Sequence, residues 1–319
     1  MDQALLYIRI YFVGIPFMVA YNFGSAIVRS YGDTRRPMYY LIVSGVLNVI
    51  LNLMLVIGFH MGVEGVAIAT LISNMVSAFL ILSHLYNRDD EFCFRPHRMR
   101  IDKNELKRVL MIGIPAGIQG AIFSVSNVFI QSGINMFGEA AIAGSSLALN
   151  FEYFTYDIAG AFAQAAVTFT SQNFGAGNIK RCLNVVKKGL TLNFGFTCFL
   201  TVLVFLAARP FLEVFGLEPD AMELGMMRVH IIIGFYFLSS IYESLAASMR
   251  GFGNSLAPAL GMLVSIVGTR MLWLATVYEA DPTFRNIMWC YPLSWFAADV
   301  LIGGLFVREM GKQKRLAKI

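Results

Sequence analysis

The sequence has little charge. Only 14% of its 319 residues are Asp, Glu, Lys or Arg, whereas a soluble domain carries about 25%. Hydrophobic residues make up 57% of the chain, and its mean hydropathy is +0.64. Apolar runs of about 20 residues, long enough to cross a bilayer as a helix, recur throughout. The scarcity of charge excludes a soluble globular protein and predicts an all-α polytopic membrane protein.

Cysteine, histidine and catalytic motifs are also scarce. The four cysteines are scattered, without a CxxC pair or a His at metal-ligand spacing, so the sequence indicates neither a zinc site nor a disulfide framework. The four histidines lie far apart, and neither HExxH nor a nucleotide-binding loop occurs. We therefore predict that the chain is not an enzyme, holds no metal or organic cofactor and binds no nucleic acid. Its partners would be the lipid bilayer and small molecules.

Hydropathy predicts nine transmembrane helices. They cover roughly residues 5–28, 37–58, 63–86, 109–136, 142–170, 184–208, 227–249, 258–278 and 286–307. Pro16 and Pro292 lie inside the first and last of these and are expected to kink them, which membrane helices tolerate.

Basic residues indicate how these helices are oriented. Most Lys and Arg lie in every second connection, around 29–36, 88–108, 180–188, 250 and 308–318. The opposite connections hold only Arg209, Arg228 and Arg285. Cytoplasmic loops are richer in Lys and Arg, so the C-terminal GKQKRLAKI is predicted to be cytoplasmic and residue 1 to face outward. The predicted location is the plasma or inner membrane of the cell.

One sequence motif occurs twice. VRSYGDTRRP at 28–37 and MRGFGNSLAP at 249–258 align at an offset of 221 residues. Each copy ends one predicted span, turns and opens the next, with Gly suited to the turn and Pro to the start of a helix. Any short turn could use these residue types, but the matched Arg favours a duplicated lobe. The matched positions are Arg29, Gly32, Asp33 and Pro37, and then Arg250, Gly253, Asn254 and Pro258.

Acidic residues within spans are candidate transport residues, because ionisable groups are costly in a bilayer. The fifth span contains Glu152 and Asp157. Helical spacing places Asp157 on one polar stripe with four other residues, and Glu152 about 140° away around the helix. The other stripe members are Asn150, Tyr153, Gly160 and Gln164. Such a stripe can line a water-filled cavity or hold helices together.

Three further spans supply candidates. The fourth offers Asn127 and Gln131, the seventh Tyr236, Ser239 and Glu243, and the ninth Asp299. We predict that Asp157, Glu243, Glu152 and Asp299 couple transport to a cation or bind substrate. The others are predicted to line the cavity. Arg270, deep in the eighth span, could instead pair with Asp299 or another acid.

Several motifs together resemble the MATE transporters, the multidrug and toxin extrusion family. They are RSYGDTRRP, GIP at 113–115, QNFGAGN at 172–178 and RGFGNSLAP. In the third motif Gln172, Asn173, Gly175 and Gly177 are predicted to form a turn before the basic Lys180 and Arg181.

The resemblance implies a fold of twelve helices in two lobes. Residues 1–86 would be the last three helices of the N-lobe, and 87–108 a cytoplasmic linker. Residues 109–310 would be a complete six-helix C-lobe, and 311–319 a basic cytoplasmic tail. The chain would then lack the first three helices of the fold.

The resemblance also implies a mechanism. A lipophilic cation would be exported by alternating access in exchange for Na⁺ or H⁺, which compete with it for a buried carboxylate. The chain departs from the NorM-like pattern at two acidic positions, which Phe123 and Ser239 occupy here. Two alternatives remain. The chain could be a truncated product that does not transport alone, or a flippase of lipid-linked sugars. The second is disfavoured because the intramembrane charges are mostly acidic.

Overall fold

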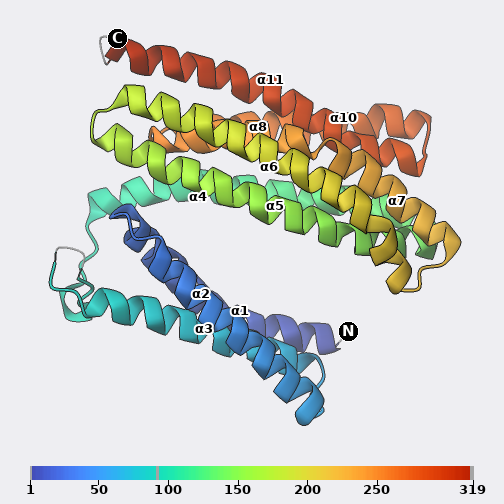
Figure 1. Cartoon of the computed structure of the whole chain (residues 1–319), viewed down its shortest axis with the longest axis horizontal. Helices are drawn as coiled ribbons and strands as arrows, with labels where there is room; N and C mark the ends of the chain where they lie inside the picture. Colours follow the sequence, from blue (N-terminus) through green and yellow to red (C-terminus); the bar gives the residue numbers. More distant parts are fainter. Residues whose placement is uncertain (1, 91–92, 317–319) are drawn as a thin grey trace. The chain divides into compact units, whose positions relative to one another are not determined.

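The chain folds into helices, as predicted. The computed structural model describes residues 2–90 and 93–316, and no β-strand occurs in these ranges (Figure 1). The chain divides into two compact units, Met1–Ile101 and Asp102–Ile319. This division lies within the linker predicted at 87–108. Below they are called the N-terminal unit and the C-terminal unit.

The N-terminal unit contains three long helices. These are α1 (Asp2–Ser30), α2 (Arg35–Asn52) and α3 (Val63–Tyr86), with the short π-helix η1 (Leu53–Gly58) and the 3-10 helix η2 (Pro96–Arg98). Both α1 and α2 pack against α3. Val28, Ile81 and Leu85 form much of the small core between α1 and α3. Pro16 lies inside α1 without ending it.

The C-terminal unit is a helix bundle. Its elements are α4 (Lys103–Asn135), α5 (Gly138–Gly175), α6 (Ile179–Val214), α7 (Pro219–Gly234), α8 (Tyr236–Gly251), α9 (Leu256–Met262), η3 (Leu263–Val267), α10 (Gly268–Trp273), η4 (Leu274–Tyr278) and α11 (Phe284–Leu316). Helix α8 packs against α5, α6 and α11 and is buried on most sides. The polar residues of α8 therefore face other helices.

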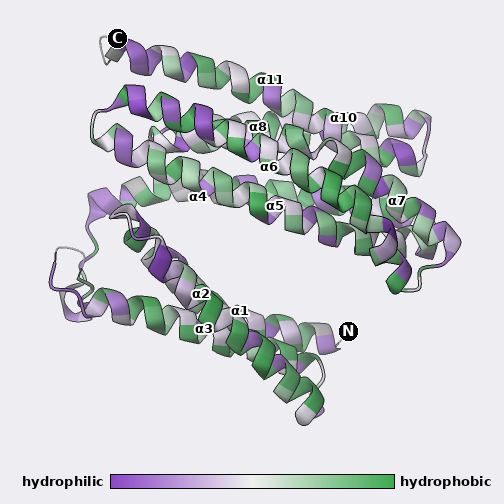
Figure 2. Cartoon of the chain, viewed as in Figure 1, coloured by the Kyte–Doolittle hydropathy of each residue, from purple (hydrophilic) through white to green (hydrophobic). Residues whose placement is uncertain are grey.

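Six helices within the described residues are long and apolar enough to cross a membrane. Helices α7 and α8 meet at Phe235 with a bend of 41° and would make a seventh span if counted together. Apolar residues run along the full length of most helices (Figure 2). The structure therefore agrees with the predicted class of polytopic membrane protein, while the count of nine spans stays a prediction.

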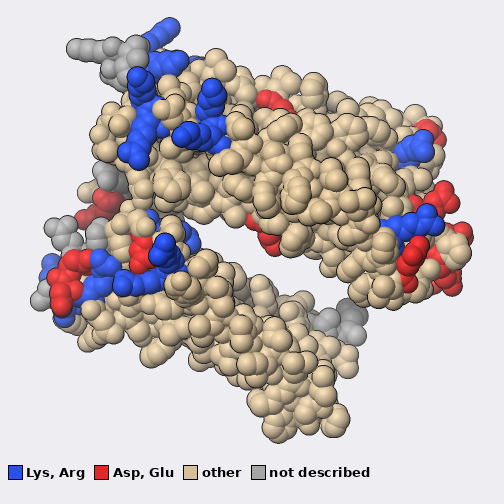
Figure 3. Space-filling model, in the orientation of Figure 1, with Lys and Arg blue, Asp and Glu red and all other residues tan. Residues whose placement is uncertain are grey.

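Lys and Arg gather at one end of the C-terminal unit. Figure 3 shows them where α5 turns into α6 and where α11 ends, whereas the other end carries both signs of charge. The basic residues of the first end include Lys180, Arg181, Arg308, Lys312 and Lys314. The connections predicted to be basic therefore lie on one side of this unit.

The contact between α5 and α7 depends on two glycines. Gly144 and Gly225 face each other with their backbones in contact, and a Cβ on Gly144 would overlap the carbonyl oxygen of Ala221. A backbone atom cannot rotate away as a side chain can. We expect Gly144→Ala to destabilise the protein by about 1–3 kcal/mol, the usual cost of overpacking.

Thermal unfolding in detergent, followed by Trp fluorescence, measures this effect as a lower melting temperature. Gly195→Ala in α6 is the matched control, because a Cβ there would meet nothing within 4 Å. Equal melting temperatures for the two variants would contradict the close α5–α7 contact.

Candidate functional site

A cavity of about 910 Å³ lies within the C-terminal unit. This volume suits a small organic molecule. Aromatic side chains contribute much of the wall, namely Phe123, Tyr153, Tyr156, Tyr236, Tyr242, Tyr291 and Trp295. The charged side chains are Glu152, Asp157, Glu243, Arg228, Arg250 and Arg270. The cavity is therefore both aromatic and charged.

Helix α5 supplies part of the predicted stripe. Tyr153, Asp157 and Gly160 line the cavity, whereas Asn150 and Gln164 do not. The Asn150 amide donates instead to backbone carbonyls of the preceding turn of its own helix, the closer at 3.1 Å. Among the described residues Asp157 makes no ion pair, so its carboxylate faces the cavity without a bound counter-charge.

Glu152 is held in a buried ion pair. The Nε of Arg228 donates to its Oε1 at 2.5 Å, and the Nη2 of Arg228 donates to its Oε2 at 3.1 Å. Arg228 comes from α7 and is 1% exposed. A carboxylate that accepts two charge-assisted hydrogen bonds from one guanidinium has its charge neutralised locally. Glu152 is therefore a weaker candidate for cation coupling than Asp157.

Arg270 reaches the cavity from α10. Its Nε donates to the Ser294 hydroxyl at 3.2 Å, and its Nη1 donates to the Asn127 Oδ1 at 3.0 Å. Its Cζ lies 4.5 Å from the centroid of the Tyr291 ring. Arg270 makes no ion pair within the described part of the chain, so the suggested pairing with Asp299 is wrong. Two π-helical turns, η3 and η4, flank the short helix that carries it.

Helix α8 brings a third acid, Glu243, to the cavity. The Oε2 of Glu243 lies 3.9 Å from the Nη2 of Arg250, a long ion pair. Tyr236 and Ser239 line the cavity on the same helix. The Ser239 hydroxyl donates to the carbonyl of Tyr236 at 2.8 Å. Arg250 thus offsets the negative charge of Glu243 only in part. The Ser239 hydroxyl is used in a hydrogen bond within its own helix.

Helix α4 closes another part of the wall. Asn127 and Gln131 both line the cavity, as does Phe123. The Gln131 amide donates to the Oδ1 of Asn135 at 2.9 Å. Asn127 points its oxygen at Arg270, which gives this predicted cavity residue a definite partner.

Asp299 lies away from the cavity lining. It sits in α11, and neither of its buried carboxylate oxygens has a hydrogen-bond partner among the described residues. The predicted acids therefore do not form one group. Three of them line the cavity, and Asp299 does not.

Sequence reasoning missed the role of Arg228. It was counted among the loop residues, but α7 places it inside the bundle. The apolar residues on both sides of it are the signal that could have revealed this. With Arg228 included, three acids and three arginines line the cavity. The charges at this site are therefore not mostly acidic, contrary to the prediction that disfavoured a flippase.

The two turn motifs share a backbone conformation. Gly32 and Gly253 both have positive φ, at 96° and 82°, a region that favours glycine. The Asp33 carboxylate accepts from the backbone N–H of Arg36 at 3.2 Å, and the Asn254 oxygen accepts from that of Ala257 at 3.3 Å. Asp33 and Asn254 thus each accept a hydrogen bond from a backbone N–H in the first turn of the next helix.

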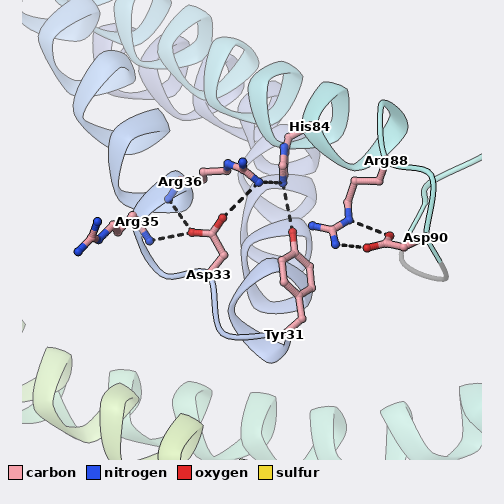
Figure 4. A network of polar contacts seen from close by, with 7 residues as sticks. All are labelled: Tyr31, Asp33, Arg35, Arg36, His84, Arg88 and Asp90. Atoms are coloured by element: carbon pink, nitrogen blue, oxygen red, sulfur yellow. Dashed lines mark hydrogen bonds and ion pairs between the residues drawn. The ribbon is translucent and has the colours of Figure 1, made fainter.

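The surroundings of the two motifs differ. In the N-terminal unit Arg36 contacts Asp33 and His84, and the His84 ring contacts the Tyr31 hydroxyl at 3.2 Å (Figure 4). Burial raises the pKa of Tyr31, although Arg88 opposes this. A basic and aromatic cluster therefore surrounds the first motif.

In the C-terminal unit the second motif contacts an acid, Glu309, instead of a basic and aromatic cluster. The Asn254 Nδ2 donates to the Oε2 of Glu309 at 2.9 Å, and Gln313 donates to Oε1 at 2.7 Å. We expect Asn254→Asp to lower the melting temperature. The new carboxylate at position 254 would face the Glu309 carboxylate, and the charge-assisted hydrogen bond between residues 254 and 309, worth about 1.5–3 kcal/mol, would be lost.

Adding Glu309→Gln should restore that melting temperature, because an amide can donate to the new carboxylate. Asn173→Asp is the matched control, since within the described residues the Asn173 amide donates to a backbone carbonyl of its own helix and to no side chain. Failure of Glu309→Gln to rescue the variant would contradict this account.

The prediction that Gln172, Asn173, Gly175 and Gly177 form a turn is only partly right, because the first three are the last residues of α5 and only Gly177 lies in the turn before α6. Gly177 has a φ of 72°, and the Asn178 side chain accepts from the backbone N–H of Arg181 at 3.1 Å. Gln172 and Gly175 lie in the last turns of α5. Within the described residues no three His, Cys, Asp or Glu side chains gather as a metal site.

Comparison with known proteins gives consistent results. A family model described as MatE matches residues 1–54 and 115–274. The chain is 29% identical over 251 residues to the probable multidrug resistance protein NorM of Thermotoga maritima, covering 77% of this chain and 54% of the relative. It is 27% identical over 321 residues to the probable multidrug resistance protein YoeA of Bacillus subtilis, covering 98% and 69%. The chain thus spans about half the length of the first relative.

The fold also matches solved structures. An outward-facing multidrug resistance MATE family transporter of the MOP superfamily superposes with a TM-score of 0.86 at 19% identity. The match covers 98% of this chain and 70% of that one.

Proposed function

The chain belongs to the MatE family, and from this premise we propose that it exports lipophilic cationic compounds as a secondary active antiporter. The observation that carries the proposal is the cavity in the C-terminal unit. Aromatic faces attract organic cations, and Tyr153, Tyr156 and Tyr236 share this wall with Asp157. A lipophilic cation would be held by these aromatic rings, and the Asp157 carboxylate would balance its charge.

Exchange requires that the coupling ion and the drug compete for one charge. Asp157 is the best-placed acid, since it faces the cavity without an ion pair in the described part of the chain. Na⁺ binding or protonation at Asp157 would remove the charge that holds the drug. The helices would then rearrange and open the cavity to the other side of the membrane. In this scheme Glu243 has a supporting role.

The proposal places the protein in the cell membrane with its C-terminus in the cytoplasm. Lys and Arg gather at the end of the C-terminal unit where α11 ends (Figure 3), and the cytoplasmic side is the more basic one. Cysteine substitutions at Lys314 and Glu218 test this orientation. A thiol reagent that cannot cross the membrane, added outside the cell, should label the cysteine at 218 and not the one at 314.

Transport itself is tested with purified protein in vesicles. A fluorescent lipophilic cation is placed on one side, and a Na⁺ or H⁺ gradient is imposed. Gradient-dependent movement of the dye supports the proposal and identifies the coupling ion. Movement that is the same with and without either gradient would show that the protein is not an antiporter of this kind.

A further inference from the structure

The cavity has a positive side that the proposed function leaves unexplained. The guanidinium groups of Arg228 and Arg270 both contact the ring of Tyr291, with their Cζ atoms 5.9 and 4.5 Å from its centroid. Arg228 and Arg270 are 1% and 4% exposed. Two buried cations next to one ring are costly unless anions balance them.

Only one of these two charges is balanced by the described residues. Glu152 pairs with Arg228 through Nε and Nη2. The Nη1 of Arg228 is buried and has no hydrogen-bond partner in the described part of the chain. The Arg270 guanidinium has only the neutral partners Asn127 and Ser294. One positive charge and one buried donor are therefore left over.

The leftover donors are held in fixed positions. Asn127 and Ser294 each accept from Arg270, and Glu152 holds Arg228 by two bonds. A guanidinium oriented in this way loses little freedom when it binds a planar or tetrahedral oxyanion. Both arginines line the same cavity, so a molecule inside it can reach them.

We propose that Arg228 and Arg270 form an oxyanion subsite that binds a carboxylate or phosphate group of the transported molecule. The inference rests on the proposed function and names the substrate class. With Asp157 elsewhere on the wall as the partner for a cationic group, the preferred substrate is an aromatic amphiphile that carries both charges. A purely cationic drug would leave Arg270 unsatisfied.

Binding to the purified protein tests the subsite without requiring transport. The probes are a rhodamine with a free benzoate carboxylate, its methyl ester and an otherwise similar rhodamine with a phosphate group. Fluorescence anisotropy measures the affinity of each. We expect the protein to bind the carboxylate or phosphate dye about tenfold more tightly than the ester, the scale of one charge-assisted hydrogen bond.

Two variants remove the positive charge in different ways. Arg270→Gln deletes the guanidinium. Asn127→Asp keeps it but places a carboxylate where the amide oxygen now accepts at 3.0 Å. Each should lower the ratio of acid-dye to ester affinity about tenfold. Asn127→Asp changes few atoms, so it tests the idea even if Arg270→Gln fails to fold.

Arg209→Gln is the matched control. Arg209 lies on α6 outside the cavity lining, its side chain is 73% exposed, and it pairs with Glu213. This variant should keep the wild-type ratio.

Each outcome decides something. A wild-type ratio near one, binding of no dye, or a ratio unchanged in both variants would overturn the subsite. A preference for only one acid dye would identify the oxyanion as carboxylate or phosphate. If the ratio behaves as expected but no gradient drives any dye, the antiporter proposal fails while the subsite stands.

Discussion

Replacing Asp157 with asparagine is expected to reduce gradient-driven export of a lipophilic cation by about tenfold or more, equal to at least 1.4 kcal/mol of lost stabilisation. Asp157 is the cavity carboxylate without an ion pair in the described residues. Asparagine keeps the shape of the side chain but removes both the charge that attracts the cation and the group that takes up Na⁺ or H⁺. Binding and coupling would therefore fall together.

The neighbouring acids should respond in a graded way. Glu243→Gln should lower export less than Asp157→Asn, because Arg250 already offsets part of the Glu243 charge from 3.9 Å. Asp220→Asn is the control, since this exposed acid in the first turn of α7 lies outside the cavity. Vesicle transport under a Na⁺ or H⁺ gradient, at matched protein levels, measures all three.

Unchanged export in the Asp157 variant would refute this assignment. Export lost in Glu243→Gln but kept in Asp157→Asn would move the coupling role to α8. Equal losses in both would mean that the two carboxylates act as one site.

The fold was largely predictable from the sequence. Apolar runs placed most helices because a bilayer demands long stretches without charge. The duplicated motif located two turns whose glycines, Gly32 and Gly253, adopt the same left-handed conformation. Hydropathy could not indicate that the span predicted at 227–249 bends at Phe235, since hydropathy measures how apolar a segment is and not its direction.

The cavity was less predictable. Helical spacing brought Tyr153, Asp157 and Gly160 to one face, and all three line it. The same spacing also included Asn150, whose amide turns back onto its own helix. Helical spacing predicts the direction in which Cβ points. Where the polar end of the side chain forms its hydrogen bond depends on the groups around it.

The charge balance of the cavity could not be predicted from single helices. Glu152 and Arg228 are 76 residues apart and belong to different helices, so no local pattern links them. Arg228 also lies near the end of a predicted span, where an arginine usually extends to the membrane surface. Only the packing of α5 against α7 shows that this one is buried.

Removing the counter-ion of Arg228 is expected to have the largest effect on stability. Glu152→Gln would leave a guanidinium that is 1% exposed without its carboxylate, and breaking such a pair from one side costs about 3–5 kcal/mol. Thermal unfolding in detergent would show a clearly lower melting temperature. Glu213→Gln, which breaks the exposed pair between Arg209 and Glu213, is the control and should cost no more than about 1 kcal/mol.

The double variant Glu152→Met with Arg228→Met separates stability from function. Replacing both charges by apolar side chains removes the desolvation cost, so it should unfold at a higher temperature than Glu152→Gln. A double variant no more stable than Glu152→Gln would contradict the buried pair as the source of the loss. If it is as stable as the wild type but no longer prefers the carboxylate dye, stability does not require the pair. The pair would then serve to hold Arg228 in the wall of the cavity, where its free Nη1 can meet an anionic substrate.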